Sequence, residues 1–277
     1  MIKVIDIDEL FDKYISDFVY GNIGKIKPEE IENEIPKLYE KFGDAPLKEL
    51  GGKTPNSFYK DYKGEELVEC LKEHLKTGVS VPDFLCEAIT ADGKNEDALF
   101  KALKEEEDEE LVIYLMNMLG EIGSKKAKDI YLEFALYEDR ESVRELATEL
   151  LCDMAEEVKE SILSHFEDAT NERKAGLTEI LSNCKGDDRV FDILAKEFAL
   201  NQNNIPMYAN FLAKYGDERA IPLLIAAIEN EKIKYSDFEE LRFAIEALGG
   251  TYDKERDFSS DVTYKKIRKM KNPKLMN

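Results

Sequence analysis

Residues 115–124 read LMNMLGEIGS, and three later segments repeat this pattern at intervals of 31 residues: LATELLCDMA (146–155), LTEILSNCKG (177–186) and YANFLAKYGD (208–217). Aligning the copies gives two apolar columns, which hold Leu119, Leu150, Leu181 and Leu212, and Leu115, Leu146, Leu177 and Tyr208. A fifth copy, FAIEALGG (243–250), fits after a small insertion with Leu248 in the first column. Apolar residues spaced i, i+3, i+4 and i+7 are typical of a helix with one buried face.

This fixed period predicts a repeat protein. Each unit is expected to be a pair of amphipathic helices that cannot bury their apolar faces alone, so neighbouring units must stack. The composition agrees, because 36% of the 277 residues are charged and an elongated array offers more surface to water than a sphere does. Only fifteen glycines and eight prolines are present, fewer than many-stranded folds need for their turns. We therefore predict an all-α fold.

The first third of the chain predicts helices outside the clear repeats. Apolar residues recur at helical spacing over 5–19, and Pro28 begins a second helix. Thr54 and Pro55 are typical of a helix start, and two more helices are expected at 65–76 and 82–91. The turn-rich stretch TADGKNED (90–97) suggests a boundary. We expect residues 1–93 to form an N-terminal helical region that caps the solenoid, 94–258 the repeats, and 259–277 a basic C-terminal tail.

Two segments resemble HEAT-like repeats of the short, bilin-lyase-associated type: LGEIGSKKAKDIYLEFALYEDRESVRELATELL (119–151) and LAKYGDERAIPLLIAAIEN (212–230). They share with that family the L-G-x-x-G-D turn, the acidic turn near Asp139, and Val143 and Arg144 followed by Ala147. ELRFAIEAL (240–248) repeats the last mark with Arg242. The resemblance covers roughly residues 94–258. It implies a right-handed α-α superhelix, that is, a HEAT-like α-solenoid.

In such an array the second helices line the inner face. The candidate partner-binding residues on this face mix polar groups with aromatic and methionine side chains: Tyr114, Asn117, Arg144, Thr148, Glu179, Met207, Asn210, Arg242 and Phe243. That composition suits a protein or peptide partner. An ordinary solvated helix face is the alternative.

Charge limits the other partners. The net charge of −21 argues against a surface that grips nucleic acid or an anionic membrane. The tail YKKIRKMKNPKLMN (264–277) is the exception, with six basic and no acidic residues. Its candidate residues are Lys265, Lys266, Arg268 and Lys269. The tail is expected either to dock on the acidic solenoid or to reach an anionic partner such as RNA.

No motif predicts catalysis, a cofactor or a metal site. GGKT (51–54) lacks the earlier glycine of a phosphate-binding loop, where Leu47 stands instead. His74 and His165 have no second ligand at zinc spacing, and both are interpreted as packing residues. The acidic run at 105–110 is expected to be a solvated turn, and the four separated cysteines to be core thiols.

The leading functional hypothesis is a non-enzymatic protein–protein interaction scaffold. Enzymes on a HEAT-like scaffold are the alternative, either DNA glycosylase-like or bilin lyase-like. The acidic charge and the absence of tryptophan oppose the glycosylase. A nucleic-acid-associated regulator acting through the basic tail is a third reading. The chain carries neither a signal-peptide pattern at its start nor a run of about 18 apolar residues, so a cytoplasmic location is expected. The oligomeric state stays open.

Overall fold

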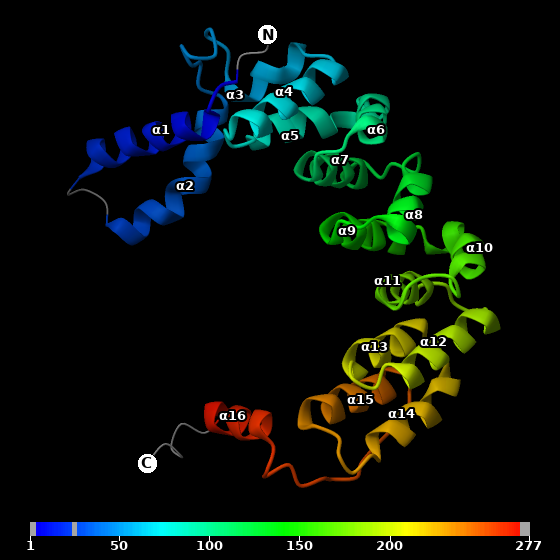
Figure 1. Ribbon diagram of the computed structural model, residues 1–277. Helices are drawn as coiled ribbons and strands as arrows, with labels where there is room; N and C mark the ends of the chain where they lie inside the picture. The colour runs from blue at the N-terminus through cyan, green and yellow to red at the C-terminus, as the bar shows by residue number, and fades with distance from the viewer. Residues whose placement is uncertain (1–3, 24–26, 272–277) are drawn as a thin grey trace. The chain divides into compact units, whose positions relative to one another are not determined.

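The computed structural model describes residues 4–23 and 27–271, and every regular element within them is a helix (Figure 1). The all-α, solenoid-like fold is thereby confirmed, while the handedness of the superhelix stays a prediction. The chain divides into two compact units. The N-terminal unit comprises Met1–Ile130 and Arg140–Leu146, and the C-terminal unit comprises Tyr131–Asp139 and Ala147–Asn277.

Seven α-helices of the described chain lie wholly in the N-terminal unit: α1 (Ile7–Asn22), α2 (Pro28–Gly43), α3 (Pro55–Phe58), α4 (Gly64–Thr77), α5 (Asp83–Thr90), α6 (Glu96–Glu105) and α7 (Glu109–Glu121). Local signals explain their starts. Asp6 accepts the Glu9 N–H at 2.8 Å before α1, and Asp108 accepts the Leu111 N–H at 3.0 Å before α7. The helices predicted at 5–19, 65–76 and 82–91, and the starts at Pro28 and Pro55, are confirmed.

The core of the N-terminal unit joins helices from both sides of the turn at 90–97. Helix α4 packs against α5 and α6, and α7 packs against α4, α5 and α6. The fully buried side chains accordingly come from all four helices: Leu71, Leu85, Ile89, Leu99, Leu103, Leu115, Met116 and Leu119. The first repeat therefore completes its core with helices that precede it in the sequence.

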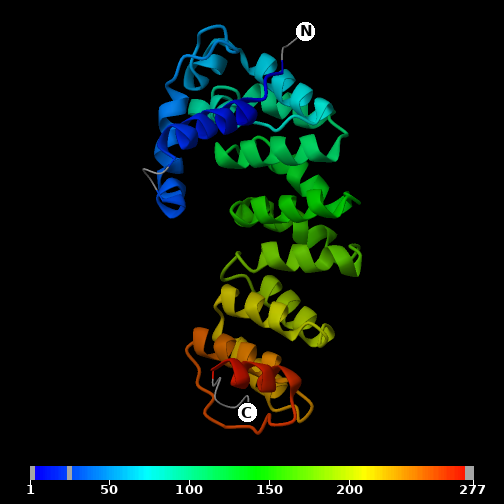
Figure 2. The same cartoon turned by 90° about the vertical axis from the view of Figure 1, so that its left-hand side faces the viewer.

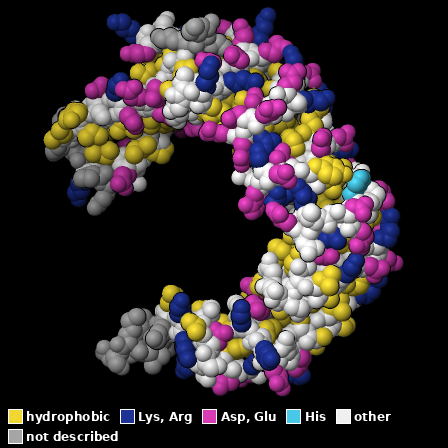
Figure 3. All heavy atoms as spheres, viewed as in Figure 1, with side chains coloured by type: hydrophobic (Ala, Val, Ile, Leu, Met, Phe, Trp, Pro, Cys, Tyr) yellow, Lys and Arg dark blue, Asp and Glu magenta, His cyan; other side chains and the backbone are white. Residues whose placement is uncertain are grey.

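The α1–α2 hairpin is packed at its base and exposed further along. Its base is held by an aromatic cluster in which Phe42 contacts Phe11, Tyr14 and Phe84. Further along the hairpin, Tyr20 and Ile23 are exposed, and Figure 3 shows hydrophobic side chains gathered on the hairpin. The hairpin is thus anchored at one end.

The remaining repeats follow as α8 (Lys128–Tyr137) with α9 (Glu141–Cys152), α10 (Ala155–His165) with α11 (Asn171–Leu181), α12 (Asp188–Leu200) with α13 (Ile205–Tyr215), and α14 (Ile221–Ile228) with α15 (Tyr235–Ala247). A short 3-10 turn, Glu218–Ala220, leads into α14. The second helices of the five repeats are therefore α7, α9, α11, α13 and α15. Their stacked order within each unit is visible in Figure 2.

The structure corrects the first apolar column in one repeat. Leu119, Leu181 and Leu212 are fully buried, as predicted. In α9, however, Leu151 is fully buried and Leu150 is half-buried. Leu248, just after α15, is buried as predicted, with 6% exposure. The intervals between repeats are therefore unequal. A shift of one residue turns a helix face by about 100°, so packing selects the neighbouring side chain.

The C-terminal segment folds back on the last repeat. Phe258 is buried against Phe238 and Tyr235, with ring centroids 5.0 and 5.3 Å apart. Helix α16 (Val262–Lys271) then packs against α15, where the Tyr264 ring lies 5.0 Å from that of Tyr235 (Figure 2). Asp261 starts α16 by accepting the N–H groups of Thr263 and Tyr264. The described part of the tail is thus a docked helix.

Candidate functional site

The predicted face residues of the N-terminal unit differ in exposure. Tyr114 is half-buried and Asn117 is exposed, both on α7. Arg144, on α9, is only 9% exposed. Its burial corrects the prediction that it lines an open face.

Thr148 in the C-terminal unit is buried as well, with 7% exposure. Its hydroxyl lies where α11 comes close, because a Cβ placed on Gly176 would be 2.8 Å from Thr148 Oγ1. Arg144 and Thr148 are buried for the same reason as Leu151: α9 is turned by one residue relative to the sequence alignment. Glu145 and Glu149 are exposed in their place.

The structure does bring Asn210 and Phe243 together. They lie on the second helices α13 and α15 and line a shallow depression of about 160 Å³ with Ala213, Glu240, Ala244 and Ala247. The three alanines leave room beside the Phe243 ring, which is 55% exposed. Glu179 on α11 and Met207 on α13 are half-buried. We call Glu179, Asn210, Glu240 and Phe243 the second-helix face.

Arg242 belongs to a different hollow, although it adjoins Phe243 in sequence. This hollow, about 670 Å³, lies between α15 and the C-terminal segment and includes Tyr252, Arg256 and Tyr264. Glu239 binds the Arg242 guanidinium at 3.0 Å, and a Glu246 oxygen lies 3.9 Å from its Nε. The positive charge of Arg242 is therefore balanced by two carboxylates of its own helix.

The tail residues lie on α16. Lys265, Lys266 and Arg268 are exposed, and Lys265 donates a long hydrogen bond of 3.4 Å to the Ser260 carbonyl. Lys269 falls within α16, and its side chain lies outside the described part of the structure, as do residues 272–277. The described basic side chains of α16 thus face water.

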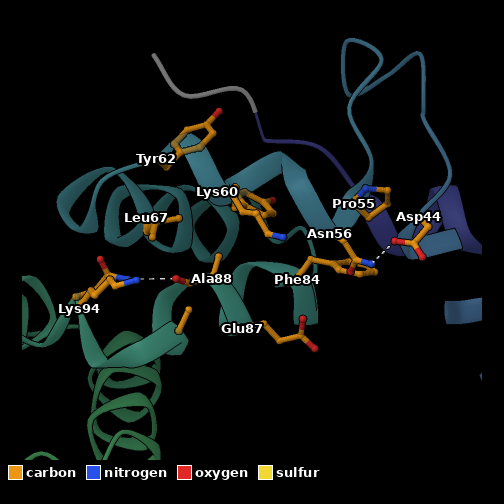
Figure 4. A pocket seen from close by; sticks show the side chains of 13 residues that line it. Asp44, Pro55, Asn56, Lys60, Tyr62, Leu67, Phe84, Glu87, Ala88 and Lys94 are labelled. Carbon is orange, nitrogen blue, oxygen red and sulfur yellow. Dashed lines mark hydrogen bonds between the residues drawn. The ribbon is translucent and has the colours of Figure 1, made fainter. Parts of the chain in front are cut away.

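A larger pocket in the N-terminal unit was not predicted (Figure 4). It holds about 680 Å³ and is lined by Asp44, Pro55, Asn56, Tyr59, Lys60, Tyr62, Leu67, Phe84, Glu87, Ala88, Ala91, Lys94 and Asn95. These residues come from the end of α2, the segment from α3 to α4, and α5 with the turn after it. The irregular stretch PLKELGGKTPNSFYKDY (46–62) was the available sequence signal.

That stretch contains a hydrogen-bonded turn beside the pocket. Gly51 and Gly52 adopt positive φ, and the Gly52 N–H donates to the Leu47 carbonyl at 2.8 Å. The N–H groups of Gly51 and Lys53 donate to the carbonyls of Lys48 and Leu50. Because these donors are used within the turn, GGKT does not form a phosphate cradle.

The histidines differ from each other. His74 is buried and its Nδ1 lies 2.8 Å from the Ser80 carbonyl oxygen, as expected for a packing residue. His165 is exposed, contrary to the prediction, and packs edge-on against Tyr137. Within the described residues, no group of three His, Cys, Asp or Glu side chains has the arrangement of a metal site.

The four cysteines are free thiols, two buried and two half-buried: Cys70, Cys86, Cys152 and Cys184. Burial raises the pKa of each thiol to about 11. They are therefore protonated at neutral pH and behave as packing residues, as the sequence predicts.

In the described chain, no helix combines the length and the apolar character needed to cross a lipid bilayer. Comparison with known proteins adds no relative: no family model matches the chain, and the search of curated proteins found no match.

Proposed function

We propose that this chain is a non-enzymatic, cytoplasmic HEAT-like repeat protein whose second-helix face binds a basic, partly apolar segment of a partner protein. The observation that carries the proposal is Phe243, a half-exposed aromatic ring beside a depression walled by Asn210 and three alanines. Aromatic side chains next to small pockets are typical energetic centres of protein interfaces.

The charge of the surroundings supports a basic partner. Glu240 lines the depression itself, and Glu179 lies on the preceding second helix. The net charge of −21 adds a long-range attraction for cations. Complementary charge raises the association rate and disfavours acidic competitors.

Asn210 supports an extended segment. Its side-chain amide is exposed and makes no hydrogen bond with another described residue. An amide both donates and accepts, so it can pair with the main chain of a bound peptide, whatever the peptide's side chains are.

A selection from displayed random 12-residue peptides tests the proposal. Immobilised protein is expected to enrich peptides that combine Lys or Arg with an aliphatic or aromatic residue. Their affinity should fall about thirtyfold or more in Phe243→Ala, because truncating a central interface aromatic costs about 2 kcal/mol or more.

Leu200→Ala is the matched control. Leu200 is 68% exposed at the end of the first helix α12, so its loss removes a comparable apolar surface outside the second-helix face. Equal losses in the two variants, or enrichment of acidic peptides, would contradict the proposal.

A second candidate is nucleic-acid association through α16, supported by the exposure of Lys265, Lys266 and Arg268 on one short helix. Labelled single-stranded RNA should then bind with strong salt dependence, and the triple Glu variant at these positions should abolish binding. RNA binding that persists in the triple variant and does not depend on salt would contradict this candidate.

A further inference from the structure

We propose that the pocket of the N-terminal unit binds a small molecule that has a planar apolar body and one anionic group. This site is independent of the second-helix face, because it lies in the other unit and uses none of its residues. At about 680 Å³, the pocket falls within the range of about 300–1,000 Å³ that is usual for small-molecule sites.

The apolar part of the pocket is built from buried rings. Tyr59 and Phe84 line it and are only 4% and 6% exposed, and Leu67 is buried beside them. The Phe84 ring stacks on Tyr39, with centroids 5.2 Å apart at 20°. Tyr59 is braced by Phe58 and Tyr62, at 4.9 and 5.9 Å. These contacts fix the rings before any ligand arrives, so a planar group loses little affinity to reorganisation.

The lining also offers a hydroxyl group next to its apolar rings. The Tyr59 hydroxyl makes no hydrogen bond with any other residue that the structure describes. Burial raises its pKa, so the hydroxyl stays protonated and can donate. A ligand oxygen in the pocket can accept a hydrogen bond from this hydroxyl.

The positive charge comes from Lys60. Its side chain extends over the pocket toward Phe84 and Asn56, and it has no ion-pair partner among the described residues (Figure 4). The two lining carboxylates belong to Asp44 and Glu87. Asn56 donates to Asp44 at 3.0 Å, and the Glu87 carboxylate lies at the opposite edge. Lys94 also lines the pocket. An anion beside Lys60 would pair with an amine that forms no ion pair with another described residue.

These features together limit the ligand class. The Lys60 amine and the Tyr59 hydroxyl together suit one carboxylate or sulfonate. A nucleotide triphosphate would need several further donors, and the neighbouring glycine turn uses its N–H groups internally. A planar apolar acid fits both halves of the pocket.

Two fluorescent probes separate the apolar and the anionic contributions. They are 8-anilinonaphthalene-1-sulfonate, an aromatic anion, and N-phenyl-1-naphthylamine, its uncharged counterpart. Titration of the full chain should show saturable binding of one equivalent of each. Lys60→Glu should weaken the sulfonate about tenfold and leave the neutral probe within about twofold, because only the sulfonate loses a charge partner. Tyr59→Phe should weaken the sulfonate alone, by a smaller factor.

Lys48→Glu is the matched control for charge. Lys48 is exposed in the same irregular stretch and does not line the pocket, so this variant changes the net charge equally. Ala88→Trp, which fills the pocket, should abolish binding of both probes; Ala91→Trp at the rim replaces it if the first variant melts early.

Three results would overturn the proposal: no saturable binding of the sulfonate, equal losses in Lys60→Glu and Lys48→Glu, or probe binding that survives filling of the pocket. Peptide binding by Phe243 is scored separately on the same variants. A loss of probe binding with peptide binding intact therefore identifies a failure of this pocket alone.

Discussion

Single buried side chains hold neighbouring repeats together in this fold. Leu181 and Leu212 are fully buried in successive second helices, and Leu151 takes the equivalent place in α9. Removing part of such a side chain loses both its transfer free energy and the contacts around the cavity that remains. The adjacent Leu150 is half-buried, so its truncation removes fewer buried contacts. Two neighbouring leucines of one helix therefore make a matched pair.

Leu151→Ala should lower the free energy of unfolding by about 2–5 kcal/mol, and Leu181→Ala should do the same. Leu150→Ala should cost clearly less than Leu151→Ala. Urea denaturation followed by circular dichroism measures all three. Equal costs for Leu150 and Leu151 would show that the assigned rotation of α9 is wrong.

The close approach of α9 and α11 gives a second residue-scale prediction. Glycine inside a helix normally costs about 1 kcal/mol relative to alanine. Here a Cβ at position 176 would lie 2.8 Å from Thr148 Oγ1, so Gly176→Ala should destabilise the protein. In a Thr148→Ala background the same change should stabilise it, because the obstructing atoms are gone. A double-mutant cycle by urea denaturation measures the effect of Gly176→Ala on the free energy of unfolding in both backgrounds. If that effect has the same sign in both, the described packing of α9 on α11 is wrong.

At the scale of elements, two helix starts carry both a cap and a link to the preceding repeat. Asp187 accepts the Arg189 N–H at 3.0 Å and pairs with its guanidinium, which also reaches Glu160 of α10 at 2.6 Å. Asp217 and Arg219 repeat the arrangement, with Arg219 reaching Asp188 at 2.8 Å. These links join the first helices of neighbouring repeats.

The Asp187 cap predicts an acid-side loss of stability. Hydrogen bonds from Arg189 lower the pKa of Asp187 from 3.8 to about 2. Because the folded-state pKa is depressed, ionised Asp187 stabilises the folded protein. This stabilisation is complete above pH 3.8 and is lost as the pH falls toward 2. Thermal melts of the wild type and Asp187→Asn should therefore differ above pH 4 and converge near pH 2. A difference that persists unchanged to pH 2 would contradict this assignment.

Helix α16 gives another element-scale prediction. Its described ring contacts to the rest of the unit are made by Tyr264 with Tyr235 and Phe258. Tyr264→Ala should release the helix, which shows as faster amide hydrogen exchange over residues 262–271 with α15 still protected. Lys265→Ala, an exposed change one residue away, should leave exchange unaltered. Similar exchange in both variants would mean that Tyr264 does not anchor α16.

At the scale of the whole molecule, each compact unit builds its core from helices that follow one another along the chain. In the N-terminal unit, α6 and α7 pack on α4 and α5, so the first repeat shares its core with the preceding helices. Terminal repeats need such a cover for their apolar faces.

A fragment that begins at residue 94 tests this sharing. Without α4 and α5, helices α6 and α7 lose their cover and should exchange their amide hydrogens rapidly. Helices α12 to α15, which pack among themselves in the other unit, should stay protected. Hydrogen exchange read by mass spectrometry compares the two groups in one sample. Protected α6 and α7 in the fragment would show that residues 1–93 are dispensable to the first repeat.

The sequence by itself determined that the chain is helical, where the first five helices begin, and that the later helices come in repeated pairs. Those features depend on local signals, namely apolar spacing and caps such as Asp6, Pro28 and Asp108, which act within one or two turns. Asn210 and Phe243 could be proposed as face residues for the same reason.

Only the tertiary structure decided which side of each helix is buried. The unequal intervals between repeats turned α9, so Arg144 and Thr148 lie inside although an even alignment places them outside. The pocket beside Tyr59 and Lys60 likewise needs α2, the 46–62 stretch and α5 to meet. No periodicity within one segment encodes such a meeting, because it depends on how side chains from separate segments fill a common space.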